Sequence, residues 1–427
     1  MMKMKNLFWG AFIALLATSC ASKDVKVTVE NTTDLERQNE MIEVNMDAVA
    51  SKLQLADTAQ VIVLDATGKQ LPYQITYDGK LIFQASVAPK GTSIYTITVG
   101  IPEPVEVLAC GRQYPERVDD IAWENDLTAY RMYGPALQAT GERAFGYDVW
   151  VKSVKEPVVE ARYASELNPE TMEQIAKLRK TNPKAADELY HSVSYHVDHG
   201  NGLDCYKVGP TLGGGATALV VDGEIVYPYC YKTYEILDNG PLRFTVKAVY
   251  NPETIKGKDV VETRVISLDA GSQLNKTVVT YENLTEATPV VAGVVLHEPL
   301  DQCHYMASAE DGYILYADPT DNVNNNNGTI YVGCVFPGML TDAKPVMYEE
   351  PEKTQERGGA DGQLLAYADY QPGSPFIYYW GSGWSKYGFE TAEAWDTYIQ
   401  NAAVAKRNPL QAVSYTHLRA HETVLDL

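Results

Sequence analysis

The stretch YKTYEILDNGPLRFTVKAVY, residues 231–250, decides the fold, because polar and apolar residues alternate on both sides of one turn signal. That signal, Asp-Asn-Gly-Pro at 238–241, is typical of a β-hairpin connection. The stretch VVETRVISLDAGSQLNKTVVTYENL, residues 260–284, repeats the pattern around Asp-Ala-Gly at 269–271. Two consecutive hairpins predict that the larger part of the chain, residues 106–411, is mainly β.

Residues 25–101 predict a small β-sandwich that precedes this larger part. Short runs of alternating residues follow one another there, separated by turn signals at 65–68 and 78–79. A helical patch near 46–53 interrupts them. The segment IPEPVEV, residues 101–107, holds two prolines and predicts a linker between two domains.

One segment of the larger part departs from the β pattern. LNPETMEQIAKLRKTNPKAADELYHSV, residues 167–193, has apolar residues at helical spacing and predicts a short helical insertion. Beyond the N-terminal leader, no stretch is apolar enough to span a membrane, and no repeat of fixed period is present. The expected fold class is mainly β, with two domains.

The first 20 residues, MMKMKNLFWGAFIALLATSC, are typical of a secretory signal, because two lysines precede a short apolar run. Their end, Ala-Thr-Ser-Cys, resembles a bacterial lipobox, in which the cysteine carries lipid. We therefore expect a lipoprotein anchored in the outer membrane through Cys20, facing the periplasm or the cell surface. The alternative is an ordinary cleavage site that happens to hold a cysteine.

The last residues do not continue the pattern of the protein. VSYTHLRAHET, residues 413–423, resembles the translation of a transposase adapter used in sequencing libraries. We interpret residues 413–427 as adapter read-through and expect them to lack fixed structure. On this interpretation the natural sequence is interrupted near Gln411, and His417 and His421 take no part in chemistry.

The composition disfavours several partners and cofactors. The chain of 427 residues has a formal net charge of −21, and an acidic surface disfavours nucleic acid and anionic lipid. We expect membrane contact only through the lipid anchor. Five scattered cysteines follow Cys20 without a Cys-x-x-Cys pair, so buried thiols are expected rather than a disulfide framework.

Three motifs carry a resemblance to a known family. They are ACGRQYPERVDDIAWENDLTAYRMYGPAL (109–137), YHVDHGNGLDCYKVGPTLGGG (195–215) and YEILDNGPLRFTVK (234–247). They resemble a family of secreted lipoproteins of unknown function from glycan-degrading gut bacteria, over residues 25–411. The order of DxAWEND (120–126), then DNGPxR (238–243), then a strand ending in LDAGSxL (268–274) is also similar to the galactose-mutarotase-like β-supersandwich. This fold occurs in sugar epimerases, polysaccharide lyases and non-catalytic domains. The resemblance implies work on glycans without fixing an activity.

The stretch SYHVDHGNGLDCYKVGPTLGGG, residues 194–215, gathers the most polar side chains. A metal site there would need a third ligand, such as Asp204 or His297, beside His196 and His199. No recognised metal-ligand spacing is present, and the glycines at 213–215 lack the lysine and serine of a phosphate loop. We therefore predict neither a metal nor another cofactor.

Acid–base chemistry suits this stretch better, because histidine titrates near neutral pH and a shifted tyrosine or lysine can also exchange protons. One alternative is a polar turn whose histidines cap backbone groups. Another is a satisfied histidine at a strand end for the histidine in VVAGVVLHEPL. The candidate catalytic residues are His196, His199, Tyr206 and His297, with Asp204 and Lys207 as substrate-binding residues.

The first motif supplies groups suited to an acidic sugar. Arg112 and Arg117 carry guanidinium forks that bind carboxylates, although internal ion pairs are the alternative. Trp123 and Trp384 are candidate platforms for sugar rings, although tryptophans in large β-proteins commonly lie in the core. We expect residues 112–126, residues 196–207 and His297 to converge on one face.

These residues lead to a hypothesis of elimination at a uronic-acid residue of an oligosaccharide, by a lyase or a dehydratase. Such chemistry needs a cation for the carboxylate, a base for the adjacent proton and an acid for the leaving oxygen. The alternatives are a mutarotase-like sugar epimerase and a non-catalytic glycan-binding protein at the cell surface. An oligosaccharide is the expected partner in each case.

Overall fold

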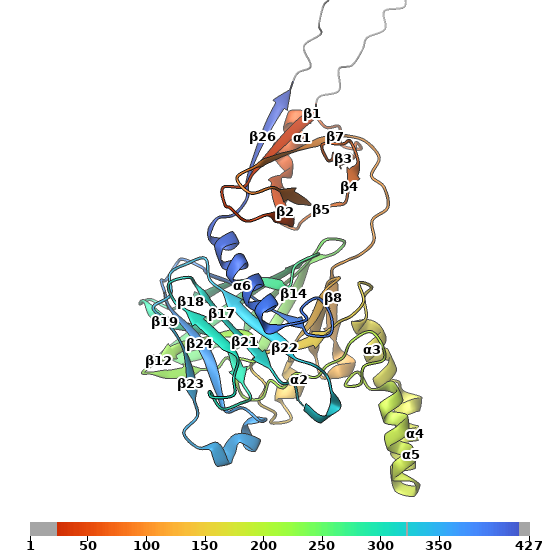
Figure 1. The fold of residues 1–427 in the computed structure, drawn as a ribbon, viewed down its shortest axis with the longest axis vertical. Coiled ribbons are helices and arrows are strands. Elements are labelled where there is room, and N and C mark those ends of the chain that lie inside the picture. The colour runs from red at the N-terminus through yellow and green to blue at the C-terminus, as the bar shows by residue number, and fades with distance from the viewer. Residues whose placement is uncertain (1–23, 322, 418–427) are drawn as a thin grey trace, which may run out of the picture.

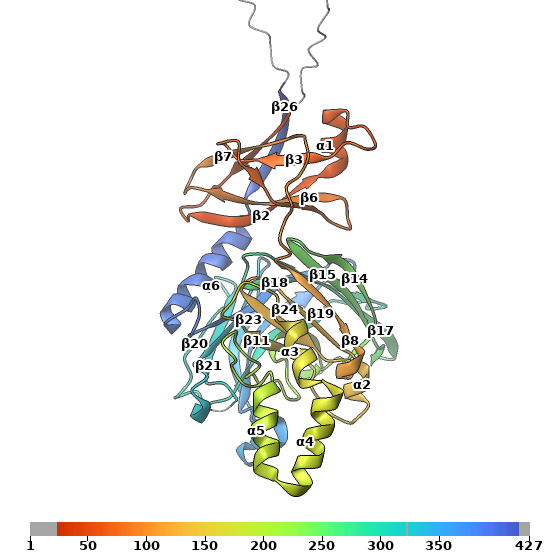
Figure 2. The same ribbon diagram turned by 90° about the vertical axis from the view of Figure 1, so that its right-hand side faces the viewer.

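The computed structural model describes residues 24–417 except residue 322, and shows a small N-terminal β-sandwich on one end of a larger β part (Figures 1 and 2). Alternate valines at 25, 27 and 29 are fully buried in the N-terminal core, as a strand with one face inward requires. Its helix is α1 (Met46–Leu53), within the predicted patch. Its first sheet contains, in order, β26 (Gln411–His417), β1 (Asp24–Glu30), β7 (Thr92–Val99), β3 (Val61–Leu64) and β4 (Gln70–Leu71). Its second sheet contains β2 (Arg37–Asn45), β6 (Lys80–Val87) and β5 (Tyr73–Ile75).

The larger part is built on a nine-stranded sheet, and both predicted hairpins lie in it. Its strands are, in order, β14 (Tyr231–Asn239), β15 (Arg243–Tyr250), β17 (Lys258–Asp269), β18 (Leu274–Glu282), β25 (Phe376–Trp384), β22 (Ile330–Val335), β21 (Tyr313–Asp318) and β20 (Tyr305–Ser308), with β16 (Glu253–Ile255) paired to β17. The strand pairs β14–β15 and β17–β18 turn at the residues that the sequence indicates.

Two smaller sheets cover the inner face of the nine-stranded sheet, and one continuous core lies between the layers. The five-stranded sheet contains β13 (Glu224–Val226), β12 (Gly214–Val221), β19 (Thr288–Leu296), β24 (Gly362–Tyr370) and β23 (Asp342–Met347). The four-stranded sheet contains β11 (Tyr147–Val151), β10 (Thr128–Met132), β9 (Asp120–Glu124) and β8 (Cys110–Tyr114). The predicted mainly β fold, with a small sandwich before a large one, is confirmed.

Helices cover two further surfaces. The last helix, α6 (Ala392–Arg407), packs on the outer face of the nine-stranded sheet through Trp395 and Ile399. The helical insertion contains α3 (Val159–Glu166), α4 (Pro169–Thr181) and α5 (Pro183–Val193). The remaining short helices are α2 (Pro135–Gln138), η1 (Pro115–Arg117), η2 (Val323–Asn325) and η3 (Pro351–Arg357).

The insertion therefore begins earlier than residue 167. Four of the eight residues of α3 are buried, and two of them, Arg162 and Glu166, are charged, so its buried face is not apolar throughout. The start of α3 is fixed from outside, because the Glu124 carboxylate accepts hydrogen bonds from the backbone N–H groups of Val158 and Val159 at 2.8–2.9 Å. A carboxylate at a helix N-terminus satisfies otherwise unpaired donors.

None of the helices in the described part of the chain is long and apolar enough to cross a membrane. The five cysteines within residues 24–417 are free thiols, and Cys205, Cys230 and Cys334 are buried. The expectation of buried thiols therefore holds for these three. The predicted anchor, Cys20, lies outside the described residues.

The expectation that the chain lacks structure beyond residue 412 is wrong for residues 413–417. These residues belong to β26, which pairs antiparallel with β1 from Gln411–Glu30 to His417–Asp24. Strand addition at a sheet edge uses backbone groups, so any extended segment of suitable length can form it. Residues 418–427 lie outside the described part, and the read-through origin stays a prediction.

Removal of residues 413–427 should change the free energy of unfolding by less than about 1 kcal/mol, because these backbone hydrogen bonds exchange with water at an exposed edge. Leu410, which packs on the N-terminal core, remains in place. The control is Leu410→Ala in the full chain, which should lose about 1–2 kcal/mol through lost apolar burial. Urea unfolding measures both, and a larger loss from the truncation than from the control would contradict this expectation.

Candidate functional site

The candidate site lies on the face of the four-stranded sheet that points away from the main core. Arg131 in β10 pairs in register with Ala122 of β9 and with Asp148 of β11, so it sits at the centre of this face. Helix α3 and the loop 194–204 cover the face, and Trp150 and Tyr195 stack there with ring centroids 4.7 Å apart. A charged residue at the centre of a covered sheet requires partners.

Three buried carboxylates surround the Arg131 guanidinium. Its Nη2 lies 2.6 Å from Asp148 Oδ2 and 2.9 Å from Asp204 Oδ2, and its Nη1 lies 3.7 Å from Asp120 Oδ2. Burial raises the pKa of Asp120 to about 6 and that of Asp148 to about 7, against the opposing effect of Arg131. Arg131 and the nearby Arg117 offset burial only in part, so the Asp148 carboxyl is partly protonated near neutral pH.

The loop 194–204 reaches this sheet through backbone pairing. Leu203 and Val151 exchange hydrogen bonds of 3.0 and 3.1 Å between their N–H and C=O groups. Gly202 has φ +93°, and a Cβ there would lie 2.1 Å from the carbonyl oxygen of Val151. Only glycine allows this approach, which brings Asp204 to Arg131.

Tyr195 joins two arginines at the edge of the cluster. Arg117 Nε donates to the Tyr195 hydroxyl at 3.1 Å, and Arg131 Nη1 donates to the same oxygen at 3.5 Å. Arg117 is 27% exposed, and its closest carboxylate oxygen, Asp120 Oδ2, is 3.9 Å away. The terminal nitrogens of Arg117 make no hydrogen bond to another residue within the described ranges.

His196 packs on the other side of Tyr195, with ring centroids 4.6 Å apart. Its Nδ1 lies 3.0 Å from the Asp204 carbonyl oxygen, and its side chain is 44% exposed. A carbonyl oxygen only accepts, so Nδ1 carries the proton of the neutral ring and Nε2 has the lone pair. His196 is thereby poised to take up a proton at Nε2.

His199 has a different position. Its Nε2 lies 3.0 Å from the carbonyl oxygen of Ser194, within the same loop. The Asp198 carboxylate accepts from the N–H groups of the glycines at 200 and 202. The alternative of a polar turn tied by its own side chains therefore describes His199.

His297 and Tyr206 form a second polar group on the far side of the segment 204–207. His297 follows β19, and its Nδ1 lies 2.6 Å from Asp318 Oδ2. Its ring lies edge-on to that of Tyr206, with ring centroids 6.0 Å apart. Its Nε2 is buried without a hydrogen-bond partner among the described residues. A Cβ at Gly359 would lie 3.9 Å from both His297 and the Lys207 side chain, so these residues are neighbours.

The hydroxyl of Tyr206 is directed into the fold. It donates to the carbonyl oxygen of Gly213 at 3.1 Å, and the side chain is buried. Of the groups predicted to converge, residues 112–126 and 196–207 meet around Tyr195. His297 contacts Tyr206 and Asp318 instead.

Three further predicted residues are engaged by the fold. Arg112 binds Glu160 at 2.8 Å and Glu116 at 2.7 Å, which is the alternative of internal ion pairs. Trp123 is fully buried, stacks on Phe244 and donates to Asn275. Trp384 is 3% exposed and donates to the carbonyl oxygen of residue 327. Both tryptophans lie in the core, so neither ring face is available to a sugar.

Sequence reasoning missed Arg131, Asp148 and Tyr195. Arg131 and Asp148 occur within the short apolar runs TAYRM and YDVWV, and an isolated charge in a buried strand is the signal that would have found them. Tyr195 directly precedes His196 in the polar stretch. Within the described residues, no group of three or more His, Cys, Asp or Glu side chains is arranged to hold a metal ion.

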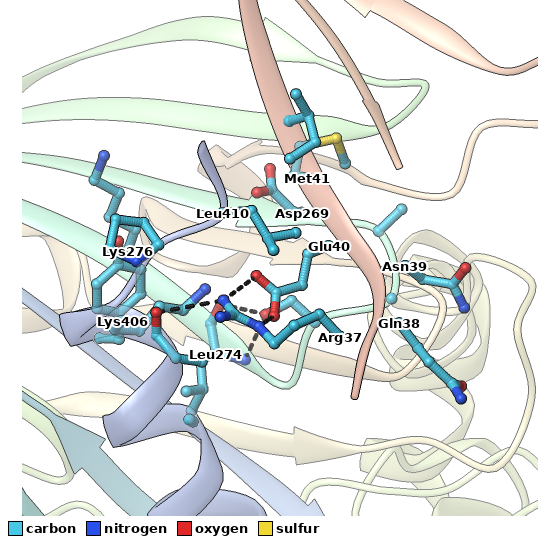
Figure 3. Close-up of a pocket in the computed structure, with 18 of the residues that line it drawn as sticks. Arg37, Gln38, Asn39, Glu40, Met41, Asp269, Leu274, Lys276, Lys406 and Leu410 are labelled. Atoms are coloured by element: carbon cyan, nitrogen blue, oxygen red, sulfur yellow. Dashed lines mark hydrogen bonds and ion pairs between the residues drawn. The ribbon is translucent and has the colours of Figure 1, made fainter. Parts of the chain in front are cut away.

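A pocket of the described chain lies elsewhere and contains none of the predicted site residues. It has a volume of about 760 Å³ and opens between β2, the β17–β18 turn and α6 (Figure 3). The candidate site rests on its polar contacts rather than on cavity size, because reactive groups and not volume define chemistry.

The model of a family described as a domain of unknown function (DUF4861) matches residues 29–412, and the chain belongs to this family. An uncharacterized protein, P7, of Formosa agariphila is 26% identical over 431 positions, covering 96% of this chain and 99% of that protein. The predicted membership of a family of unknown function is confirmed.

Two solved structures from Enterococcus faecalis are similar to the chain. One is a protein in glycosyl hydrolase family 38, with a TM-score of 0.43 and 9% identity. The other is an alpha-mannosidase, with a TM-score of 0.46 and 10% identity. Both matches cover 92% of this chain and 47% and 46% of those chains, so the chain spans about half of their length.

The raised pKa of Asp120 predicts how stability changes with pH. The folded protein holds this proton more tightly than the unfolded chain, whose pKa is about 4. The stabilisation is complete below about pH 4 and falls by up to about 3 kcal/mol as the pH rises to about 6. Asp120→Asn has no such proton, so its free energy of unfolding should decline less across this window.

Urea unfolding at a series of pH values measures the effect. The control is Asp222→Asn, because Asp222 is exposed in a turn where asparagine adopts the same positive φ. It should keep the pH profile of the parent. An Asp120→Asn profile parallel to that of the parent would show that Asp120 titrates normally.

Proposed function

We propose that this member of the DUF4861 family acts on an acidic oligosaccharide by elimination beside a uronic-acid carboxylate, as a lyase or a dehydratase. The observation that carries the proposal is the Tyr195 hydroxyl, which accepts from Arg117 and Arg131 while the His196 ring packs on the same tyrosine. A cation (Arg117) and a proton acceptor (His196) thereby each contact the same proton donor, Tyr195. These are the three groups that the reaction needs.

Arg117 binds the substrate carboxylate in this proposal. It is partly exposed, it is held at Nε by Tyr195, and its terminal nitrogens are available for a forked contact with two oxygens. Neutralising the carboxylate lowers the cost of the negative charge that develops when the adjacent carbon loses its proton.

His196 is the base. Its Nε2 lone pair takes the proton from the carbon beside the carboxylate, and the electron pair of that C–H bond forms the C=C double bond. The bond from the next carbon to its oxygen breaks in the same step. The contact between Nδ1 and the Asp204 carbonyl stabilises the imidazolium that results.

Tyr195 is the acid. Its side chain is 2% exposed, so it reaches the substrate only through its hydroxyl, beside the partly exposed Arg117. Burial raises its pKa, so the phenol is protonated at neutral pH and can give its proton to the departing oxygen. Arg117 and Arg131 then stabilise the phenolate. The product is an unsaturated uronide together with an alcohol for a lyase, or with water for a dehydratase.

His196→Ala and Tyr195→Phe should each reduce kcat/KM by a hundredfold or more, as loss of a general acid or base does. The measurement is the ultraviolet absorbance of the unsaturated uronide, with oligogalacturonate and oligoglucuronate as substrates. The control is His304→Ala, because His304 is 42% exposed and pairs with Asp396 far from this site. It should retain the activity of the parent.

Each other outcome has a defined meaning. Full activity in His196→Ala and Tyr195→Phe would refute the assignment of the site. Epimerised product without absorbance would favour an epimerase, for which the His297–Asp318 pair offers an oriented imidazole. Binding without turnover by the parent protein would favour a non-catalytic glycan-binding protein.

We further propose that the chain is exported and tethered to the outer membrane through Cys20, on the strength of the lipobox-like sequence. Cys20→Ser should release soluble protein or block processing, because lipid cannot attach to serine. Membrane fractionation measures the effect, with Cys303→Ser as a control in the folded part. A Cys20→Ser variant that still fractionates with membranes like the parent would contradict the anchor.

A further inference from the structure

The pocket between the two parts of the molecule has a floor of four adjacent strands (Figure 3). Arg243 of β15 pairs in register with Asp269 of β17, and Lys276 of β18 pairs with Tyr379 of β25. These side chains lie on the outer face of the nine-stranded sheet. Helix α6 forms one wall and residues 35–43 of the N-terminal sandwich form another.

Four carboxylates line this pocket, and all but that of Glu36 are engaged by an arginine. Arg243 binds Asp269 at 2.5 and 2.9 Å and Glu43 at 2.6 Å. Arg37 binds both oxygens of Glu40 and also donates to the carbonyl oxygens of residues 405 and 408, at the end of α6. The arginines and carboxylates therefore neutralise one another and shape the walls.

Two lysines remain without a carboxylate. Neither Lys276 nor Lys406 lies within 4.0 Å of an acidic oxygen in the described part of the chain. Lys406 Nζ lies 4.8 Å from the ring centroid of Tyr379, the residue opposite Lys276. Burial lowers the pKa of Lys406, the carboxylates of Glu40 and Asp269 oppose this effect, and the charges of Arg37 and Lys276 lower the pKa further. Two like charges kept together in a partly desolvated pocket favour an anion between them.

The lining of the pocket is balanced in charge, with four acidic and four basic side chains, whereas the whole chain has a formal net charge of −21. An anionic ligand would be repelled by most of the surface and attracted here. The volume of about 760 Å³ suits a ligand of several rings. Neutral polar groups of Ser267, Asn401 and Tyr398 line the pocket beside the lysines and suit hydroxyl-rich rings.

We propose that this pocket binds an anionic segment of an oligosaccharide, with a carboxylate or sulfate group held between Lys276 and Lys406. The inference rests on the proposed function in one respect, which is that the substrate is an acidic glycan. The pocket contains no residue of the elimination site, so it is a separate binding site for the same oligosaccharide.

Isothermal titration calorimetry with oligogalacturonate tests the proposal, in the full chain carrying Arg117→Ala so that the elimination site is disabled. This protein should bind the oligomer. Adding Lys276→Gln or Lys406→Gln should weaken binding tenfold or more, as loss of a charged contact does. Lys406→Arg, which keeps the charge, should stay within a few-fold of the parent. The control Lys232→Gln, at an exposed lysine of the edge strand β14, should bind like the parent.

Inorganic sulfate distinguishes the source of the anion. Competition by sulfate at millimolar concentration would favour a sulfated segment, and competition by galacturonate alone would favour a carboxylated one. Equal binding of a neutral oligomer of the same length, or binding unchanged in both Gln variants, would overturn the proposal. So would failure of the Arg117→Ala protein to bind either acidic probe.

The two proposals fail separately. Unchanged binding in both Gln variants, with normal ultraviolet absorbance in the protein that keeps Arg117, would refute only the inference about the pocket. Pocket binding in a protein that never forms the unsaturated product would sink only the elimination. Thermal unfolding of each Gln variant verifies that the two parts of the molecule still fold together.

Discussion

Burying a guanidinium is costly unless its N–H groups and its charge find partners, and the arrangement around Arg131 follows from this constraint. Its strand supplies the central position of the four-stranded sheet, and the strand on each side supplies one carboxylate. The third, Asp204, comes from a loop, so the ion pair fixes the loop as well. The positions of Tyr195 and His196 are consequences of that ion pair, since both residues belong to the same loop.

The sequence reveals the composition of such a site better than its geometry. The polar stretch at 194–215 and the motif at 109–137 can be recognised in the sequence because their residues are close together in the chain. Arg131 and Asp148 are invisible as a pair, because their contact depends on the register of β10 against β11. The role of each histidine also depends on which ring nitrogen makes its hydrogen bond. His196 and His199 look equivalent in sequence, yet His196 contacts a backbone carbonyl through Nδ1 and His199 does so through Nε2.

The same limit applies to the fold. Alternation predicts strands well where one face is buried, as in β15 and β17, and turn residues locate their hairpins. The sequence does not predict helix α3, because charged side chains are buried on it and because its start depends on Glu124, more than 30 positions earlier. The sequence does not predict strand β26 either, because the available edge of β1, and not the side chains of β26, specifies this edge strand.

The outer face of the nine-stranded sheet shows how a polar pocket persists between two packed parts. A small apolar cluster that includes Ile82, Leu242 and Ala270 joins the N-terminal sandwich to the sheet. Polar contacts add to it, such as the hydrogen bonds from the backbone N–H groups of Leu242 and Arg243 to Gln74 and the ion pair between Arg243 and Glu43. The linker at 101–107 and the chain from α6 to β26 connect the parts a second and a third time (Figures 1 and 2). An interface held at several points by directional bonds keeps its walls fixed without filling its centre, and a preformed pocket reduces the entropy lost when a ligand binds.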